Sequence, residues 1–141
     1  MDLVTALAFA RTTTRSVLVT IRRDGRPQLS NVLHAVFDDG TIRISTTTVR
    51  AKARNLAREP WAALHVTQED FRAYTVLEAT VELTPAAADP HDAVTDMLVE
   101  HYRALFGDHD DWTAFREQQV ADGRILALLR PTRAYGMLPV S

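Results

Sequence analysis

The sequence predicts a mainly β protein with some helix (α+β), a split β-barrel of about six or seven antiparallel strands with helices at its periphery. Short, β-branched segments with alternating side chains recur along the chain. Turn dipeptides such as Asp24-Gly25 and Asp39-Gly40 separate the first of them, as in antiparallel hairpins. Six or seven such strands exceed what one flat sheet would hold, so a closed or split barrel is the economical fold. At 141 residues and 46% hydrophobic composition, the chain can bury one core, and we expect a single domain over residues 1–141.

The N-terminal third is predicted to be a short helix followed by an antiparallel meander. Leu3, Leu7 and Ala10 share one helical face, and the threonines that follow end the helix. The predicted elements are a helix over residues 3–10 and strands over residues 16–22, 28–37 and 41–46.

The rest of the chain alternates predicted helices and strands. Thr48 is expected to cap a helix that ends at Glu59-Pro60, and Asp89 to cap a longer helix with Pro90 at its first position and Gly107 at its end. The final strands flank Pro131. The predicted elements are helices over residues 49–58, 90–107 and 112–120 and strands over residues 61–66, 73–83, 124–130 and 133–137.

Composition and missing motifs exclude several classes of function. The 18 acidic residues outnumber the 16 basic ones, which disfavours a nucleic-acid binder. Without cysteine the chain has no thiolate chemistry, and its five histidines form no metal-binding signature, so we expect no metal site. The apolar stretch 3–10 is too short to span a membrane, so a cytoplasmic location is expected. Nucleophile-elbow, Walker and dinucleotide-binding glycine motifs are also absent.

The segment 46–56, TTTVRAKARNL, is the strongest candidate for a binding site. It holds the only lysine of the chain, Lys52, between Arg50 and Arg54, at the predicted start of a helix. Free backbone N–H groups, the hydroxyls of residues 45–48 and these cations together favour a phosphate or carboxylate. The alternative is a solvated basic helix face, because Arg50, Arg54 and Arg58 are spaced four residues apart.

A second candidate is the polar interruption of the strand over residues 28–37. Ser30 and Asn31 place hydrogen-bonding groups on both faces of a strand that should be apolar. These groups suit a planar heterocycle, which could use both the Asn31 amide and exposed backbone. The alternative is that Asn31 only satisfies a carbonyl at a bulge or strand edge.

Three segments together resemble a known family: residues 24–32 (DGRPQLSNV), residues 50–56 (RAKARNL) and Tyr135-Gly136. The chain is similar over nearly its whole length to the pyridoxamine 5'-phosphate oxidase-like split β-barrel proteins, and in particular to their actinobacterial branch that uses the deazaflavin coenzyme F420. The resemblance implies a homodimer with two cofactor sites at its interface. It further implies that the residues at the start of the helix hold the cofactor's phosphate and acidic tail and that others lie beside its ring. The implied cofactor-binding residues are Gln28, Ser30, Asn31, Ser45, Thr46, Arg50, Ala51, Lys52 and Tyr74.

The activity implied by the resemblance is transfer of a hydride from the reduced deazaflavin to an unsaturated or quinone-like small molecule. An FMN-binding pyridoxamine phosphate oxidase-like protein or flavin reductase is one alternative, and a non-catalytic F420 carrier is another. A deazaflavin tail needs cations beyond those for one phosphate, such as Arg54 or Arg58. The sequence departs from the family at Arg72 and Ala79, and residues 130–141 lack the arginine and histidine contacts of true pyridoxamine phosphate oxidases. We assign no catalytic residue, and Tyr74 or solvent is the expected proton source.

Overall fold

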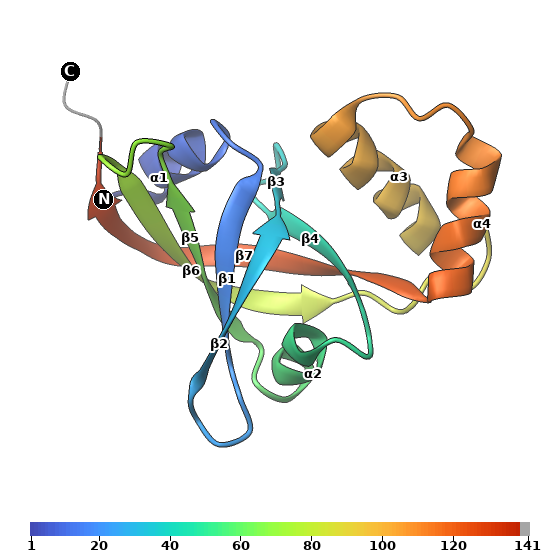
Figure 1. The fold of residues 1–141 in the computed structure, drawn as a ribbon, viewed down its shortest axis with the longest axis horizontal. Helices are drawn as coiled ribbons and strands as arrows, with labels where there is room; N and C mark the ends of the chain where they lie inside the picture. The colour runs from blue at the N-terminus through green and yellow to red at the C-terminus, as the bar shows by residue number, and fades with distance from the viewer. Residues whose placement is uncertain (139–141) are drawn as a thin grey trace.

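The computed structural model describes residues 1–138 and consists of one antiparallel sheet with four helices around it (Figure 1). The sheet has seven strands in the order β2-β1-β5-β6-β7-β4-β3. The strands are β1 (Arg15–Ile21), β2 (Pro27–Leu33), β3 (Ala35–Val36), β4 (Ile42–Thr47), β5 (Trp61–Thr67), β6 (Tyr74–Leu83) and β7 (Arg124–Met137). The helices are α1 (Leu3–Ala10), α2 (Ala51–Arg58), α3 (Ala93–Phe106) and α4 (Trp112–Asp122). The predicted split-barrel architecture is confirmed.

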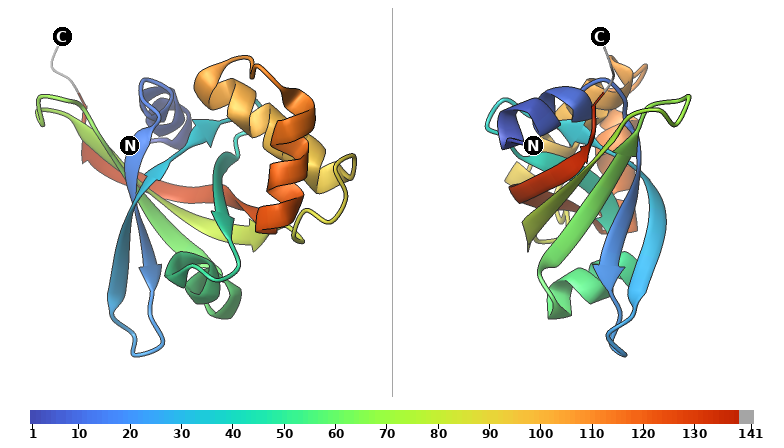
Figure 2. Two further views of the ribbon diagram at one scale, coloured as in Figure 1. Left: turned by 45° about the vertical axis from the view of Figure 1, so that its right-hand side comes forward. Right: turned by 90° about the vertical axis from the view of Figure 1, so that its left-hand side faces the viewer.

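The sheet curls strongly, so that its inner face encloses the main core (Figure 2). Side chains alternate along each strand, and those on the inner face, such as Leu18, Ile44 and Leu64, are fully buried. Helix α1 covers one end of this core with Ala6 and Phe9. Helix α2 lies near the other end, against β1 and β6.

Helices α3 and α4 form a second layer outside the barrel, beside β4 and β7 (Figure 1). Leu98 of α3 and Leu126 of β7 are buried in a separate apolar cluster between these layers. Asp92 caps α3 by accepting a hydrogen bond from the Thr95 N–H at 2.8 Å, so the prediction that Asp89 caps this helix is wrong. Asp89 instead accepts from the His91 N–H in the preceding turn.

The predicted strand over residues 28–37 is two strands that lie at opposite edges of the sheet. β2 pairs with β1, whereas β3 pairs only with β4. Between them, His34 is buried. Its Nδ1 lies 2.7 Å from the Ser16 hydroxyl and its Nε2 lies 2.9 Å from the Ala10 carbonyl oxygen. At His34 the chain passes from β2, at one edge of the sheet, to β3, at the other edge. The two edges therefore lie close together there.

The two strands predicted around Pro131 are one continuous strand, β7. Glu78 pairs with Arg133 and Ala79 pairs with Pro131, so one residue of β7 is extra at this point. Such a bulge admits a proline, which has no N–H to give to the ladder. Within residues 1–138, no helix is long and apolar enough to cross a membrane.

Candidate functional site

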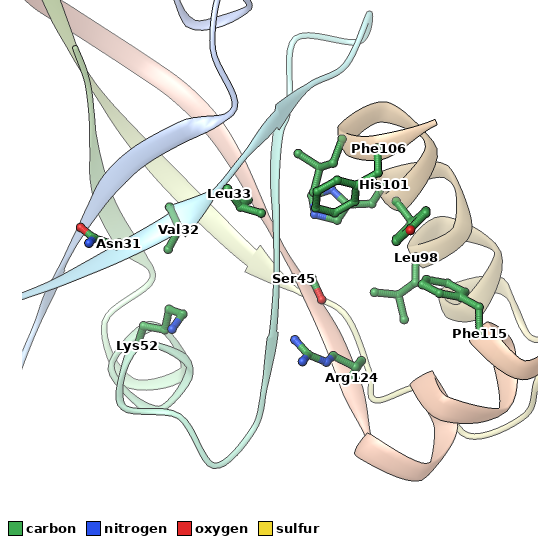
Figure 3. Close-up of a pocket in the computed structure, with 12 residues that line it drawn as sticks. Asn31, Val32, Leu33, Ser45, Lys52, Leu98, His101, Phe106, Phe115 and Arg124 are labelled. Carbon is green, nitrogen blue, oxygen red and sulfur yellow. The ribbon is translucent and has the colours of Figure 1, made fainter. Parts of the chain in front are cut away.

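The barrel is open along a seam between β2 and β4. The two strands come close in space, yet in the part of the chain that the structure describes no ladder joins them. A pocket of about 400 Å³ occupies this seam, bounded by residues of β2, β4 and β7 and of helices α2, α3 and α4 (Figure 3). Asn31, Ser45 and Lys52 line it, and all three are among the residues expected from the sequence.

The register of β1 and β2 determines which backbone groups of β2 point into the seam. The Arg22 N–H donates to the Arg26 carbonyl, and the His34 N–H donates to the Thr14 carbonyl, each at 2.8 Å. Hydrogen-bonded pairs alternate along an antiparallel ladder, so the even-numbered residues of β2 bond to β1. The N–H and C=O groups of Asn31 and Leu33 therefore point away from β1, toward the seam.

The same reasoning applies to β4. The Phe37 N–H donates to the Thr41 carbonyl at 2.9 Å, and Ala35 is paired with Arg43, so odd-numbered residues of β4 face β3. Because β3 has only two residues, Ser45 has no partner strand on that side. Two strand edges with free donors and acceptors thus flank the pocket, an arrangement suited to a flat molecule with in-plane polar groups.

One end of the pocket is cationic. Lys52 of α2 and Arg124 of β7 both line it, and Arg50 is near enough to act on Lys52. Partial burial lowers the pKa of Lys52 most, and the positive charges of Arg50 and Arg124 lower it further. No carboxylate lies within 4 Å of the Lys52 ammonium in residues 1–138. Such a cluster would be stabilised by an anion.

The start of α2 adds to this positive potential. The structure corrects the prediction that Thr48 caps this helix: the cap is Arg50, in an extended conformation and without a capping side-chain hydrogen bond. The Arg50 N–H donates to the Thr47 carbonyl oxygen at 3.2 Å in a tight turn, so the helix begins only at Ala51. The first N–H groups of α2 therefore receive no side-chain acceptor from the described chain and can bind an anion.

Six other predicted residues do not line the pocket: Gln28, Ser30, Thr46, Arg50, Ala51 and Tyr74. Gln28 and Ser30 are half-buried on the face of β2 that carries Val32, which belongs to the barrel core. Thr46 is buried, and its hydroxyl has no hydrogen-bond partner in the described chain. Tyr74 packs beside His65, with ring centroids 5.5 Å apart.

Sequence reasoning missed the contributions of β7 and of the helical layer. Arg124 reaches the seam because it pairs with Thr47, the last residue of β4. His101, Tyr102, Phe106 and Phe115 line the side of the pocket that α3 and α4 form. No local motif marks these residues, because strand pairing and helix packing bring them to the seam.

The open seam with its hydrogen-bonding edges defines a split β-barrel, and the groups at its pocket are suited to a planar molecule with an anionic group. The chain belongs to the pyridoxamine 5'-phosphate oxidase family, which matches it over residues 5–137. The sequence-based identification of this family is confirmed.

Solved structures share this fold. A conserved hypothetical protein from Mycobacterium tuberculosis is 21% identical with a TM-score of 0.76, and the match covers 100% of this chain and 91% of the other. A protein named F420 reductase is 27% identical with a TM-score of 0.63, covering 91% of this chain and 94% of the other. A pyridoxamine 5'-phosphate oxidase-related, FMN-binding protein from Nostoc punctiforme is 18% identical with a TM-score of 0.65, covering 95% and 81%.

Proposed function

We propose that this protein is an F420-dependent oxidoreductase that reduces an unsaturated or quinone-like small molecule. The observation that carries the proposal is the seam pocket, where Lys52 and Arg124 lie beside the uncapped start of α2 and two free strand edges. The similarity to an F420 reductase over most of both chains supports the choice of cofactor.

The cations at the seam fit a ligand with several negative charges. Lys52, Arg50 and the N–H groups at the start of α2 would hold a phosphate, and Arg124 would extend the site. Arg54 is exposed on the same helix and is available for a carboxylate tail. Arg58 is already engaged, because its Nη2 donates to the Ile21 carbonyl at 2.9 Å and to Asn55 Oδ1 at 3.1 Å. Arg54 therefore replaces Arg58 as our candidate for the tail.

The strand edges would bind and orient the ring system. The backbone groups of Asn31, Leu33 and Ser45 offer both donors and acceptors to the polar edge of a flat heterocycle. A reduced deazaflavin supplies a hydride when it is bound. Val32 and Leu33 present apolar surface beside the ring and would exclude water, and we assign proton delivery to solvent.

FMN binding is the second candidate, for an oxidase-like protein or a flavin reductase. The FMN-binding relative from Nostoc punctiforme supports it, and a single phosphate would use only part of the cationic cluster. A non-catalytic F420 carrier is the third candidate, since such a protein would need the same site. The number of cations at the seam favours F420 over FMN.

A parallel titration with F420 and FMN tests the proposal. We expect purified protein to quench F420 fluorescence saturably and to bind F420 at least tenfold more tightly than FMN. Tighter binding of FMN would contradict the choice of cofactor. Binding of F420 without oxidation of the reduced cofactor by any of a panel of enones and quinones would support the carrier.

We also propose a homodimer that uses the outer face of the sheet. Leu29 and Leu33 of β2 are 60% and 41% exposed, next to the half-buried Val17 and Val19 of β1. An apolar sheet face of this kind is stabilised when a second copy covers it. Sedimentation should give twice the chain mass, and Leu29→Lys should shift it toward the monomer. A monomeric mass for the unmodified protein would contradict this proposal.

We retain a cytoplasmic location as part of the proposal.

A further inference from the structure

A second pocket, of about 420 Å³, opens on the outer face of the sheet over β1, β2 and β5. The strand register places its lining residues on one face, because Val17 is paired with Asn31 on one side and with His65 on the other. The neighbouring pair, Arg15 and Leu33, also lines it. We call this site the outer pocket.

The outer pocket combines an apolar surface with a cation. Val17 and His65 are half-buried, and Leu33 is exposed. Arg15 is exposed, and within residues 1–138 no carboxylate lies within 4 Å of its guanidinium. An occupant that brings both an apolar group and an acid would therefore be complementary to the pocket.

The turn of residues 68–72, between β5 and β6, presents an aromatic ring to solvent. Phe71 is 79% exposed, and in the described part of the chain it is the only residue other than glycine with a positive φ, +64°. The turn is well ordered, because the Phe71 N–H donates to the Gln68 carbonyl and the Arg72 N–H donates to the Asp70 carboxylate, each at 2.9 Å. A bulky side chain is disfavoured in this backbone conformation, and the exposed ring gains little burial within its own chain.

The 68–72 turn also carries the charge that the outer pocket lacks. It holds two acids, Glu69 and Asp70, and one cation, Arg72, so its net charge is negative. Asp70 accepts hydrogen bonds inside the turn, whereas Glu69 is exposed and has no cation within 4 Å in residues 1–138. Glu69 is therefore available to pair with Arg15 of another copy.

The turn and the outer pocket adjoin each other on the molecule. Thr67, the last residue of β5, lines the outer pocket and lies only four residues before Phe71. Arg15 and Glu69 also border one shared cleft. Two complementary features side by side suit a two-fold dimer, because an axis between them places each turn over the pocket of the other copy.

We propose that in the homodimer the 68–72 turn of each copy docks in the outer pocket of the other. Phe71 packs against Val17 and His65, and Glu69 pairs with Arg15 across the interface. This inference rests on the proposed homodimer and names the contact that holds it together. Docking covers the exposed ring and pairs both charges, which explains why the chain keeps a phenylalanine at this position.

Replacing Phe71 by glycine tests the docked ring. Phe71→Gly should keep the turn, because glycine adopts a positive φ without strain. We expect the dimer Kd, from sedimentation at several concentrations, to rise at least tenfold, since a two-fold dimer loses the contact twice. Phe106→Ala is the control, because Phe106 is also exposed (59%) but lies at the end of α3, outside the outer pocket. Its dimer Kd should stay within twofold, and circular dichroism checks that both variants are folded.

Charge reversal tests whether the ion pair joins two chains. Arg15→Glu alone and Glu69→Arg alone should each weaken the homodimer, because like charges then meet at both contacts. Mixing the two variants should restore dimers, since the heterodimer pairs opposite charges at both contacts. A pair within one chain would give no restoration on mixing, and this result would overturn the proposed docking.

The same measurements separate this inference from the homodimer itself. A dimer whose Kd is unchanged by Phe71→Gly would contradict the docked turn and leave the homodimer intact. Equal weakening by Phe71→Gly and Phe106→Ala would also overturn the docked turn. A monomeric mass for the unmodified protein would contradict both proposals.

Discussion

Leu33 of β2 and Ser45 of β4 lie opposite each other across the open seam, yet no ladder joins them. Their alignment follows from the register of β3 and β4. Ala35 pairs with Arg43, and continuing this register by two residues aligns Leu33 with Ser45. Both residues direct their backbone groups toward the seam, so they could bond to each other in a closed barrel. The bend at buried His34 separates the strands beyond this point and leaves hydrogen-bonding groups for a ligand.

Replacing Ser45 tests whether these backbone edges bind the cofactor. Ser45→Pro removes an N–H that faces the seam and spares the ladder to β7, because the hydrogen-bonded pairs there are those of Ile44 and Thr46. We expect cofactor affinity to fall by about 1 kcal/mol relative to Ser45→Ala, which keeps the N–H. Fluorescence titration of both variants measures this, with urea unfolding as the check that each is folded. Equal affinities would contradict a role for the Ser45 N–H.

Lys52→Ala should weaken cofactor binding by about 1 to 3 kcal/mol, the cost of losing a charge-assisted hydrogen bond. Its stability should not fall, because the ammonium repels Arg50 and Arg124 in the free protein. Titration with F420 measures the affinity, and urea unfolding the stability. Arg72→Ala, which removes an exposed cation from the turn between β5 and β6, is the control. Unchanged F420 affinity in folded Lys52→Ala would contradict the proposal that Lys52 binds the anionic group of the cofactor.

Gly136→Ala should destabilise the fold strongly. Gly136 has a φ of +150°, and an added Cβ would lie 2.2 Å from the Tyr74 carbonyl oxygen. The neighbouring strand backbone must shift to accept it, so we expect a loss of about 2 to 4 kcal/mol in unfolding free energy. Gly107→Ala is the control, because Gly107 also has a positive φ but faces open space, and its cost should be about 1 kcal/mol. Urea unfolding that gives equal losses would contradict the close approach at Gly136.

Stability should fall as the pH is lowered from about 7 to 4, because buried histidines resist protonation. Burial lowers the pKa of His101 from 6.5 to about 4, with Arg43 and His34 contributing, and burial also lowers the pKa of His34. Between these pH values the unfolded chain binds a proton that folded His101 does not, so His101 alone costs roughly 2 to 3 kcal/mol by pH 4. Above about pH 6.5 His101 is neutral in both the folded and the unfolded chain, so it no longer lowers stability.

Urea unfolding at several pH values measures this effect. His101→Leu should flatten the dependence between pH 7 and 4, and the residual slope should include the share of His34. His91→Leu, which replaces an exposed histidine, should keep the full slope. An unchanged slope in folded His101→Leu would show that this histidine is not the source.

The barrel strands and the basic start of α2 could be predicted from the sequence because they depend on residues that are neighbours in the chain. β-branched alternation and turn dipeptides determine the strands around Asp24-Gly25 and Asp39-Gly40. The clustering of Arg50 and Lys52 is a property of adjacent residues, so the sequence also revealed the basic start of α2. The helix cap was predicted wrongly, because Thr48 and Arg50 both precede the helix and a tight turn decides between them.

The tertiary structure alone decided where the seam opens and what lines it. Arg124 is about seventy residues from Lys52 in the sequence and meets it only because β7 pairs with β4. The aromatic side of the pocket depends on how α3 and α4 pack outside the barrel, and the free edges depend on the bend at His34. Local patterns report which groups a segment carries, whereas long-range pairing and packing decide which of those groups stay unpaired, and the unpaired groups make the site.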